Sequence, residues 1–502
     1  MGARGREDRT VSRRTFTGAA ALALMGSLEA CTSDGEQVDV VLVTEPPGST
    51  VLPGEDPAGT AVALSRALFD SADVAVVVTE DSPEQLSAVA AEAGLPVLVG
   101  TGEPVAEELS RLGVRTVMST AGPMLDGLDG DVEVVELDPS TDDVELPQVR
   151  RKGHPLAVTL CVDPGQELPA RAAAVALVEA AGGTVAEFPG GDVGRSGESV
   201  AAVRAAAGDD PARGVLALGG SFGPADAWQG ALQGALTAPE LPGGGITAFP
   251  GRRMVAMYGS PGAPSLGVLG EQGIEQSLTR VQELVAEYEG LVEEPLVPAL
   301  EIISTIASSE PGDDGDYSRA LGVDTLREWV DAAGEAGVYV VLDLQPGTTD
   351  FLTQARLYEE LLTAPHVGLA LDSEWRLEPG QKHLEQIGSV TAAEINEVGA
   401  WLADLTAEHD LPQKVLILHQ FSGSMIRDRQ DVDTSRPELA ITLHADGHGV
   451  PGDKLDTYRA LQRDLPEGIF MAWKNFYDED TPMFTPQQTV DVDPRPWLVS
   501  YQ

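Results

Sequence analysis

The C-terminal half of the chain is patterned as apolar runs that break into polar residues at their C-terminal ends. Eight such runs follow residue 250. Short, continuous apolar runs are typical of strands that are buried on both faces of a parallel sheet. Stretches with apolar residues three and four positions apart separate most of the runs and predict amphipathic helices. The predicted strands are 254–258, 299–305, 338–344, 367–372, 414–420, 438–444, 468–474 and 497–501.

This alternation predicts an α/β fold class with two parts. Eight parallel strands with intervening helices over ~250 residues describe a (β/α)8 barrel, so we predict a C-terminal TIM barrel over residues 250–502. Shorter runs alternate with helical stretches over residues 38–130 and 150–240, which predicts a flavodoxin-like, parallel-sheet α/β region. The second segment can be read as a diverged copy of the first. The acidic stretch 131–148 reads as a linker between them.

Length, composition and charge narrow the class of protein. The chain has 502 residues, more than one ordinary domain holds, and 42% of them are hydrophobic, which is enough for sizeable cores. Its 80 acidic residues outnumber 32 basic residues and give a formal net charge of −48. Such a charge repels phosphate backbones, so we expect no nucleic-acid partner.

Residues 1–31 resemble an export and anchoring signal. A basic start leads to S-R-R-T-F at 12–16, which is similar to the twin-arginine export motif, and a short apolar segment follows. L-E-A-C at 28–31 resembles a bacterial lipobox, which implies that Cys31 receives a lipid. The resemblance implies an exported lipoprotein on the outer face of the cytoplasmic membrane, at the cell wall. The remaining cysteine, Cys161, follows an apolar run and is expected to be a buried thiol.

Part of the N-terminal region resembles a wall-binding family. The segments T-A-V-A-L-S at 60–65, A-D-V at 72–74, L-P-V-L at 95–98 and E-L-S-R-L-G at 108–113 are similar to the cell-wall-binding repeat 2 family of Gram-positive surface proteins. That family holds proteins to anionic wall polymers, usually through tandem copies, and the resemblance covers a single copy. It implies an anionic wall polymer as a partner. The whole chain also resembles actinobacterial lipoproteins that join such a repeat to a barrel.

The polar residues at the strand ends form the predicted site. In a TIM barrel the C-terminal ends of the strands meet at one face, and that face carries the active site. Glu301 lies earlier, inside the second predicted strand, and is expected to face the barrel interior. The other candidates are Tyr258, Asp343, Asp372, Glu374, Trp375, His419, Gln420, His444, Asp446, Trp473 and Lys474.

The fourth predicted strand carries the most specific motif. It runs V-G-L-A-L-D-S-E-W over 367–375, and Asp372 and Glu374 are expected to share a face. Neighbouring carboxylates shift each other's pKa, which acid catalysis at neutral pH requires. The motif is similar to the fourth-strand D-x-E of chitinase-like and muramidase-like TIM-barrel glycoside hydrolases, although two upstream aspartates of the chitinase pattern correspond to Val367 and Ala370. The resemblance implies that Glu374 is the general acid and that Asp372 orients the substrate, and we group Asp343 with them.

Two features of this face have alternative interpretations. Four aromatic residues offer flat faces on which sugar rings can stack, but each can equally pack between the barrel and its helices: Trp375, Trp473, Phe476 and Tyr477. The histidines, with Asp446, can bind a divalent metal, but hydrogen bonding in the cleft is the favoured interpretation for His419. We therefore predict no metal and no cofactor.

The sequence thus predicts a membrane-anchored, extracytoplasmic lipoprotein whose barrel hydrolyses a glycan of the cell envelope or the environment through Glu374. The alternative is a non-catalytic surface lipoprotein that binds cell wall or carbohydrate. Hydrolysis requires Glu374 with a raised pKa in a cleft, whereas binding requires only the aromatic rings.

Overall fold

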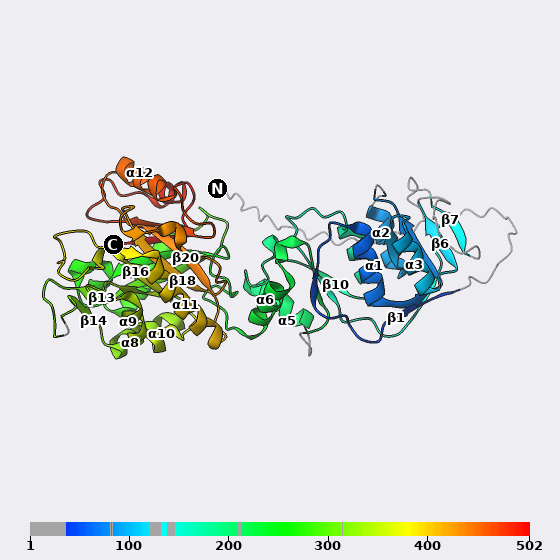
Figure 1. Cartoon of the computed structure of the whole chain (residues 1–502), viewed down its shortest axis with the longest axis horizontal. Helices are drawn as coiled ribbons and strands as arrows, with labels where there is room; N and C mark the ends of the chain where they lie inside the picture. Colours follow the sequence, from blue (N-terminus) through cyan, green and yellow to red (C-terminus); the bar gives the residue numbers. More distant parts are fainter. Residues whose placement is uncertain are drawn as a thin grey trace, which may run out of the picture.

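The chain forms an elongated molecule with the C-terminal barrel at one end and α/β layers at the other (Figure 1). The computed structural model describes residues 37–80, 82, 84–120, 132–137, 146–207, 212–313 and 315–502. The predicted signal segment 1–31, with Cys31, lies outside the described residues, as does half of the predicted linker 131–148.

The C-terminal part is a closed barrel of eight parallel strands, which confirms the predicted fold class. Strand β12 pairs with both β13 and β22 and so closes the barrel. A short antiparallel strand, β14 (Ser318–Ala320), extends the edge of β13. The barrel strands are β12 (Arg253–Gly259), β13 (Leu296–Ala307), β15 (Tyr339–Leu344), β16 (Val367–Asp372), β18 (Lys414–Gln420), β20 (Leu439–Ala445), β21 (Phe470–Asn475) and β22 (Leu498–Tyr501).

Helices cover the outside of the barrel because each presents an apolar stripe to the strands. In α7, for example, Val281, Leu284 and Val285 are buried at the spacing of one helical face. The connection from β18 to β20 holds no α-helix and carries β19 (Ile426–Arg427), which pairs with β17 (Val390–Thr391), and the 3-10 turn η6 (Arg429–Asp431). The barrel helices are α7 (Ile274–Ala286), α8 (Val323–Glu335), α9 (Phe351–Leu357), α10 (Glu359–Leu362), α11 (Ala392–Glu408), α12 (Pro451–Leu461) and α13 (Pro486–Val490).

The N-terminal part contains two four-stranded, all-parallel sheets, as expected for a parallel-sheet α/β region. The first has the order β5-β4-β6-β7 and the second the order β10-β9-β11-β2. The first sheet comprises β4 (Val74–Val78), β5 (Val97–Val99), β6 (Thr116–Ser119) and β7 (Glu133–Glu136), with α1 (Pro57–Leu68), α2 (Glu84–Ala93) and α3 (Glu103–Leu112). The second comprises β2 (Thr50–Leu52), β9 (Thr159–Val162), β10 (Thr184–Glu187) and β11 (Val215–Leu218), with α4 (Arg171–Ala180), α5 (Gly197–Ala207) and α6 (Ala225–Thr237).

Strand pairing links the two N-terminal segments more closely than the sequence indicates. Strand β2 lies early in the chain but pairs with β11 of the second sheet. A third sheet joins β1 (Val38–Leu42) to β3 (Phe69–Ala72) and to β8 (Val149–Lys152). The predicted linker also contributes a strand, β7, because Val134 and Val135 favour extended backbone while the flanking glutamates stay exposed at the sheet edge.

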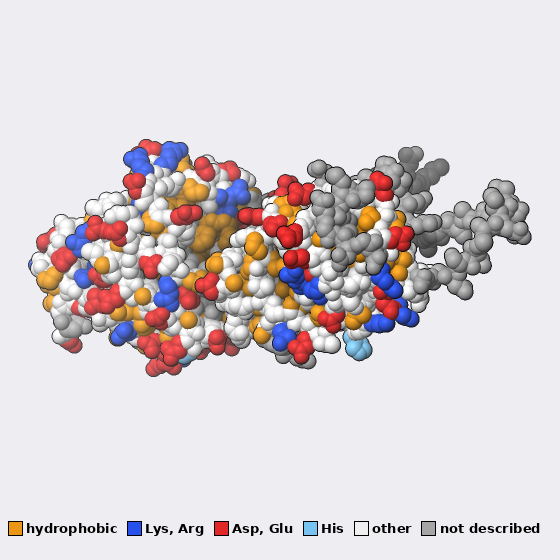
Figure 2. All heavy atoms as spheres, turned by 45° about the vertical axis from the view of Figure 1, so that its right-hand side comes forward, with side chains coloured by type: hydrophobic (Ala, Val, Ile, Leu, Met, Phe, Trp, Pro, Cys, Tyr) orange, Lys and Arg blue, Asp and Glu red, His pale blue; other side chains and the backbone are white. Residues whose placement is uncertain are grey.

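The surface reflects the composition of the chain. On the face shown in Figure 2, acidic side chains are spread over both halves of the molecule. Among the described residues, every helix is too short or too polar to cross a bilayer.

Candidate active site

One inward-facing side chain from each barrel strand forms a polar ring above an apolar core. The side chains inside the barrel alternate along each strand, so residues two apart point the same way. The core layer contains small and aliphatic residues such as Ala256, Ala299, Ala370 and Ala472. The polar ring lies two residues further along each strand and consists of Tyr258, Glu301, Asp343, Asp372, His419, His444, Lys474 and Ser500, all of them buried.

The same alternation decides which candidates reach the barrel interior. Seven residues of the ring were predicted from the sequence, and Ser500 was not. Gln420 and Trp473 each adjoin a ring residue on the same strand and therefore face outward. Gln420 bonds to the backbone of Ser422 at 3.0 Å and accepts from Arg429 at 2.7 Å. We therefore do not place Gln420 in the site.

Trp473 belongs to the packing between the barrel and its helices. It is 1% exposed, stacks on Phe484 with ring centroids 5.2 Å apart, and meets Tyr458 edge-on at 5.4 Å. Of the two interpretations open from the sequence, packing describes this tryptophan. We do not place Trp473 in the site either.

Above the ring, at the C-terminal face of the barrel, lies a cavity of about 490 Å³. The predicted candidates that line it are Tyr258, Asp372, Glu374, Trp375, Asp446 and Lys474. Gln345, Phe421, His448, Phe476 and Glu479 line it too. Glu301, Asp343, His419 and His444 do not line the cavity and are fully buried within the ring. Two larger hollows, of about 860 and 630 Å³, involve the N-terminal layers and contain no residue of the ring.

The D-x-E motif brings both of its carboxyl groups to this cavity. Strand β16 ends at Asp372, and Glu374 follows in a 3-10 turn, η5 (Ser373–Trp375). The expectation that the two residues share one face of a strand is therefore wrong. Burial, and next the charge of Asp446, raise the pKa of Glu374 to about 7. Burial raises the pKa of Asp372 well above its ordinary value, and the charge of Glu374 adds to this effect. Both groups can therefore hold a proton near neutral pH.

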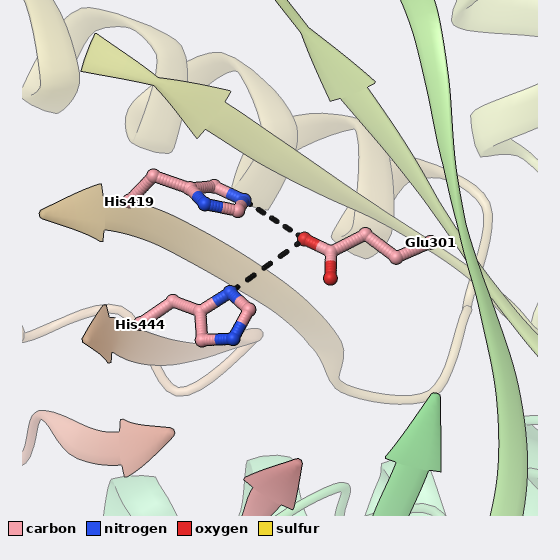
Figure 3. Close-up of side chains that lie close together, drawn as sticks. All are labelled: Glu301, His419 and His444. Carbon is pink, nitrogen blue, oxygen red and sulfur yellow. Dashed lines mark hydrogen bonds and ion pairs between the residues drawn. The ribbon is translucent and has the colours of Figure 1, made fainter. Parts of the chain in front are cut away.

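His419 lies between two carboxylates inside the barrel. Its Nε2 is 2.8 Å from Oε1 of Glu301, and its Nδ1 is 2.8 Å from Oδ2 of Asp446. Burial alone would lower the pKa of His419, but these two carboxylates raise it well above its usual range. Burial lowers the pKa of His444 to about 4, so its ring is neutral. Figure 3 shows the Glu301 carboxylate reaching between the two imidazole rings.

On the opposite side of the polar ring, Tyr258 contacts both Asp343 and Lys474. The Tyr258 hydroxyl donates to Oδ2 of Asp343 at 2.9 Å. Burial raises the pKa of Asp343 to about 6. The ammonium of Lys474 lies 3.5 Å from the centroid of the Tyr258 ring and supplies positive charge among the carboxylates.

Of the residues of the site, sequence reasoning missed Ser500 and Phe421. Gln345 follows Asp343 by two positions, and its amide lies 3.5 Å from Oδ2 of Asp372. The two-residue period of the strand identifies this position, and likewise Ser500 at the end of β22. The loop residues Phe421 and Phe476 follow β18 and β21 directly and offer apolar faces in the cavity.

Comparisons with known proteins identify no family. No protein-family model and no curated protein matches the sequence. Among solved structures, the chain is similar to a quadruple mutant of the α-N-acetylgalactosaminidase NagBb from Bifidobacterium bifidum, with a TM-score of 0.22 and 13% identity. The match covers 46% of this chain and 44% of the neighbour, so the chain spans less than half of that protein's length. A likeness this slight carries no argument about activity, and the proposals below rest on the site itself.

Proposed function

We propose that the barrel is a glycoside hydrolase in which Glu374 is the general acid. The observation that carries this proposal is the placement of Glu374 and Asp446 around one cavity at the C-terminal face, together with aromatic rings. Hydrolysis of a glycosidic bond requires one carboxylic acid to protonate the leaving oxygen and a second carboxylate to support the positive centre at the sugar.

Each residue has a role that its surroundings support. Glu374 donates its proton to the glycosidic oxygen as the bond to the anomeric carbon breaks. Asp446 supports the oxocarbenium-like centre, because one of its oxygens is fixed by His419 and the other, Oδ1, has no hydrogen-bond partner among the described residues. Water then adds its hydroxyl to the anomeric carbon and returns a proton to Glu374. Asp372 orients the substrate from below.

The aromatic residues support a sugar as the substrate. Trp375, Phe421 and Phe476 line the same cavity as Glu374. Their flat apolar faces suit pyranose rings, whose axial C–H groups pack on aromatic surfaces. We propose a glycan of the cell envelope or the environment as the substrate.

The proposal is tested by counting new reducing ends. Wild type and Glu374→Gln are incubated with purified actinobacterial cell walls and with N-acetylated oligosaccharides. Wild type is expected to release reducing ends at a rate that falls as the pH rises through about 7, because a general acid must hold its proton. Glu374→Gln is expected to lose at least ~100-fold of this activity.

Glu385→Gln is the matched control, because Glu385 is an exposed glutamate eleven residues further along the chain. It should keep the activity of wild type. If wild type and Glu374→Gln sediment with the walls and neither releases reducing ends, the barrel binds glycan without hydrolysing it. That outcome overturns the proposed activity in favour of a binding protein.

We propose further that the chain is an exported lipoprotein at the cell wall. The twin-arginine-like and lipobox-like sequences before Cys31 support this location. Replacing Cys31 by alanine is expected to move the protein from the membrane fraction to the medium. Equal membrane retention of wild type and Cys31→Ala would contradict a lipid at this residue.

A further inference from the structure

Three side chains from three barrel strands converge on one point in the polar ring (Figure 3). Nε2 of His419 lies 2.8 Å from Oε1 of Glu301, and Nδ1 of His444 lies 3.8 Å from the same oxygen. Oδ1 of Asp343 is 3.9 Å from Nε2 of His419. All four side chains are fully buried. Two imidazole nitrogens and the Glu301 carboxylate therefore face a shared space inside the barrel, within 4.8 Å of one another, and Asp343 adjoins His419.

Several of these atoms have no hydrogen-bond partner among the described residues. They are Oε2 of Glu301, Oδ1 of Asp343 and Nδ1 of His444. Buried polar atoms in folded proteins nearly always have a partner, because leaving them without one costs their full desolvation. Three such atoms on neighbouring side chains point to a common partner that the chain itself does not provide.

The far side of each imidazole is held by another side chain. Nδ1 of His419 bonds to Oδ2 of Asp446 at 2.8 Å, and Nε2 of His444 bonds to Oγ of Ser500 at 3.0 Å. Because an ionised carboxylate only accepts hydrogen bonds, Asp446 fixes the proton of His419 on Nδ1 and turns Nε2 toward Glu301. Histidines that bind metals are held in this way by a carboxylate, a backbone carbonyl or a water behind the ring, and the Ser500 hydroxyl takes that place for His444.

We propose that the polar ring binds one divalent transition-metal ion through Glu301, His419 and His444, with Asp343 as an adjoining carboxylate. Two imidazoles with carboxylates are the ligand set of zinc-class ions, whereas magnesium and calcium prefer oxygen ligands throughout. The inference goes beyond the proposed glycan hydrolysis and does not depend on it. It also departs from the sequence prediction, which contained no metal.

Two other arrangements are less compatible with the geometry. Donor atoms of Asp372, His419 and Asp446 also lie within 4.8 Å of one another, but this group offers one imidazole where the first offers two. In the second arrangement there is no metal, and Nε2 of His419 carries a proton and donates it in a hydrogen bond to Oε1 of Glu301. That proton satisfies one oxygen of Glu301 and leaves the other three atoms without a partner.

The experiment measures the metal content of the whole chain. The protein is treated with a chelator, dialysed against Zn²⁺ in the presence of excess Mg²⁺ and Ca²⁺ to occupy surface carboxylates, and then analysed by elemental mass spectrometry. About one Zn²⁺ per chain is expected for wild type. Loading with Co²⁺ instead should give the visible absorption of a cobalt ion bound by histidines.

Variants separate the ring from other sites. His444→Gln is expected to abolish stoichiometric binding, and Ser500→Ala, which removes no ligand, should weaken it by ~10–100-fold. Two controls should bind like wild type: His448→Gln, which alters the cavity wall, and His409→Gln, which alters an exposed histidine. If His444→Gln fails to fold, Ser500→Ala and the cobalt absorption of wild type still decide the question.

The inference is overturned if wild type binds no stoichiometric Zn²⁺ or Co²⁺. It is also overturned if Ser500→Ala binds as tightly as wild type while His448→Gln does not, because the ion would then lie in the cavity. Neither result bears on the release of reducing ends, which is measured separately with Glu374→Gln.

Discussion

Glu374 is held in surroundings that favour its neutral form. Burial in the barrel mouth opposes ionisation, and the carboxylate of Asp446 adds to this effect, while Lys474 and His419 act in the opposite direction. The balance raises the pKa of Glu374 to about 7, whereas an exposed glutamate ionises near 4.5. A group held this way reduces the stability of the fold at any pH where it must ionise.

This balance predicts how stability depends on pH. Between about pH 4.5 and 7 the folded state holds a proton on Glu374 that the unfolded chain has lost, so the free energy of unfolding decreases as the pH rises through this window. Glutamine does not titrate. The free energy of unfolding of Glu374→Gln, relative to that of wild type, is therefore expected to rise by about 1–3 kcal/mol between pH 5 and pH 8.5.

The measurement is thermal unfolding of both proteins at these two pH values, with EDTA present so that bound metal does not contribute. In a domain of this size each kcal/mol corresponds to roughly 2–4 °C in the Tm of the barrel. For Glu385→Gln, at an exposed position, the difference in Tm from wild type should be the same at both pH values. If the difference in Tm between Glu374→Gln and wild type is also the same at both pH values, the pKa of Glu374 is not raised.

At the scale of elements, helix α12 fixes the two loops that frame one side of the cavity. Lys454 on α12 forms a buried ion pair with Asp480 and donates to the backbone oxygen of Lys474 at 2.7 Å. Asp480 also accepts from the backbone nitrogens of Gly449 at 2.9 Å and Phe476 at 3.0 Å. The loops after β20 and β21 are thereby joined, and they present His448 and Phe476 to the cavity.

Breaking this pair is expected to destabilise the barrel strongly. Lys454→Met leaves the Asp480 carboxylate buried without its cation, which costs about 3–5 kcal/mol. The double variant Lys454→Met with Asp480→Asn removes the unpaired charge and should recover part of the loss. Urea unfolding measures both, with Lys382→Met as the control at an exposed lysine. A loss below ~0.5 kcal/mol in Lys454→Met would show that the pair contributes nothing to the fold.

The elements were the most predictable part of this molecule. All eight barrel strands were located from the sequence, because strands buried on both faces read as continuous apolar runs. The site was predictable as far as the strand ends. Gln420 and Trp473 were included because strand ends were counted without the two-residue period, which turns them outward.

Contacts across the barrel could not be predicted. Glu301 meets His419 and His444 only because closure of the sheet and its register bring β13 opposite β18 and β20. Strand β2 is three residues long, and its pairing with β11 joins positions about 165 residues apart in the chain. A strand of three residues is too short to show a periodic pattern in the sequence. Its pairing with a strand far along the chain leaves no local pattern either, since the register is fixed by packing between elements.

At the scale of the whole molecule, the barrel and the N-terminal layers have separate cores. The N-terminal clusters contain buried side chains from residues 40–235, and the barrel clusters contain those from residue 241 onward. The segment that connects them contributes to both, since Leu241, Ala248 and Phe249 belong to a barrel cluster and Ile246 packs against an N-terminal one. Arg252 fixes this segment by donating to the backbone oxygens of Gly244 at 2.6 Å and Thr247 at 3.1 Å.

Separate cores predict two independent unfolding transitions. Each core buries its own apolar surface, so neither part needs the other for its stability. Calorimetry of the whole chain should resolve two transitions. A chain of residues 239–502 should reproduce the barrel transition within ~2 °C.

One variant in each part tests this independence. Glu108 is buried in the first α/β layer and accepts from Arg66 at 2.9 Å, Arg111 at 2.7 Å and the buried Ser65 hydroxyl. Glu108→Ala leaves that hydroxyl without its acceptor and is expected to lower only the stability of the N-terminal part, by about 1–3 kcal/mol. Lys454→Met is expected to lower only the barrel transition. If either variant moves both transitions, or if residues 239–502 fail to fold alone, the connecting segment couples the two parts. The N-terminal layers would then be required for the stability of the barrel and of its cavity.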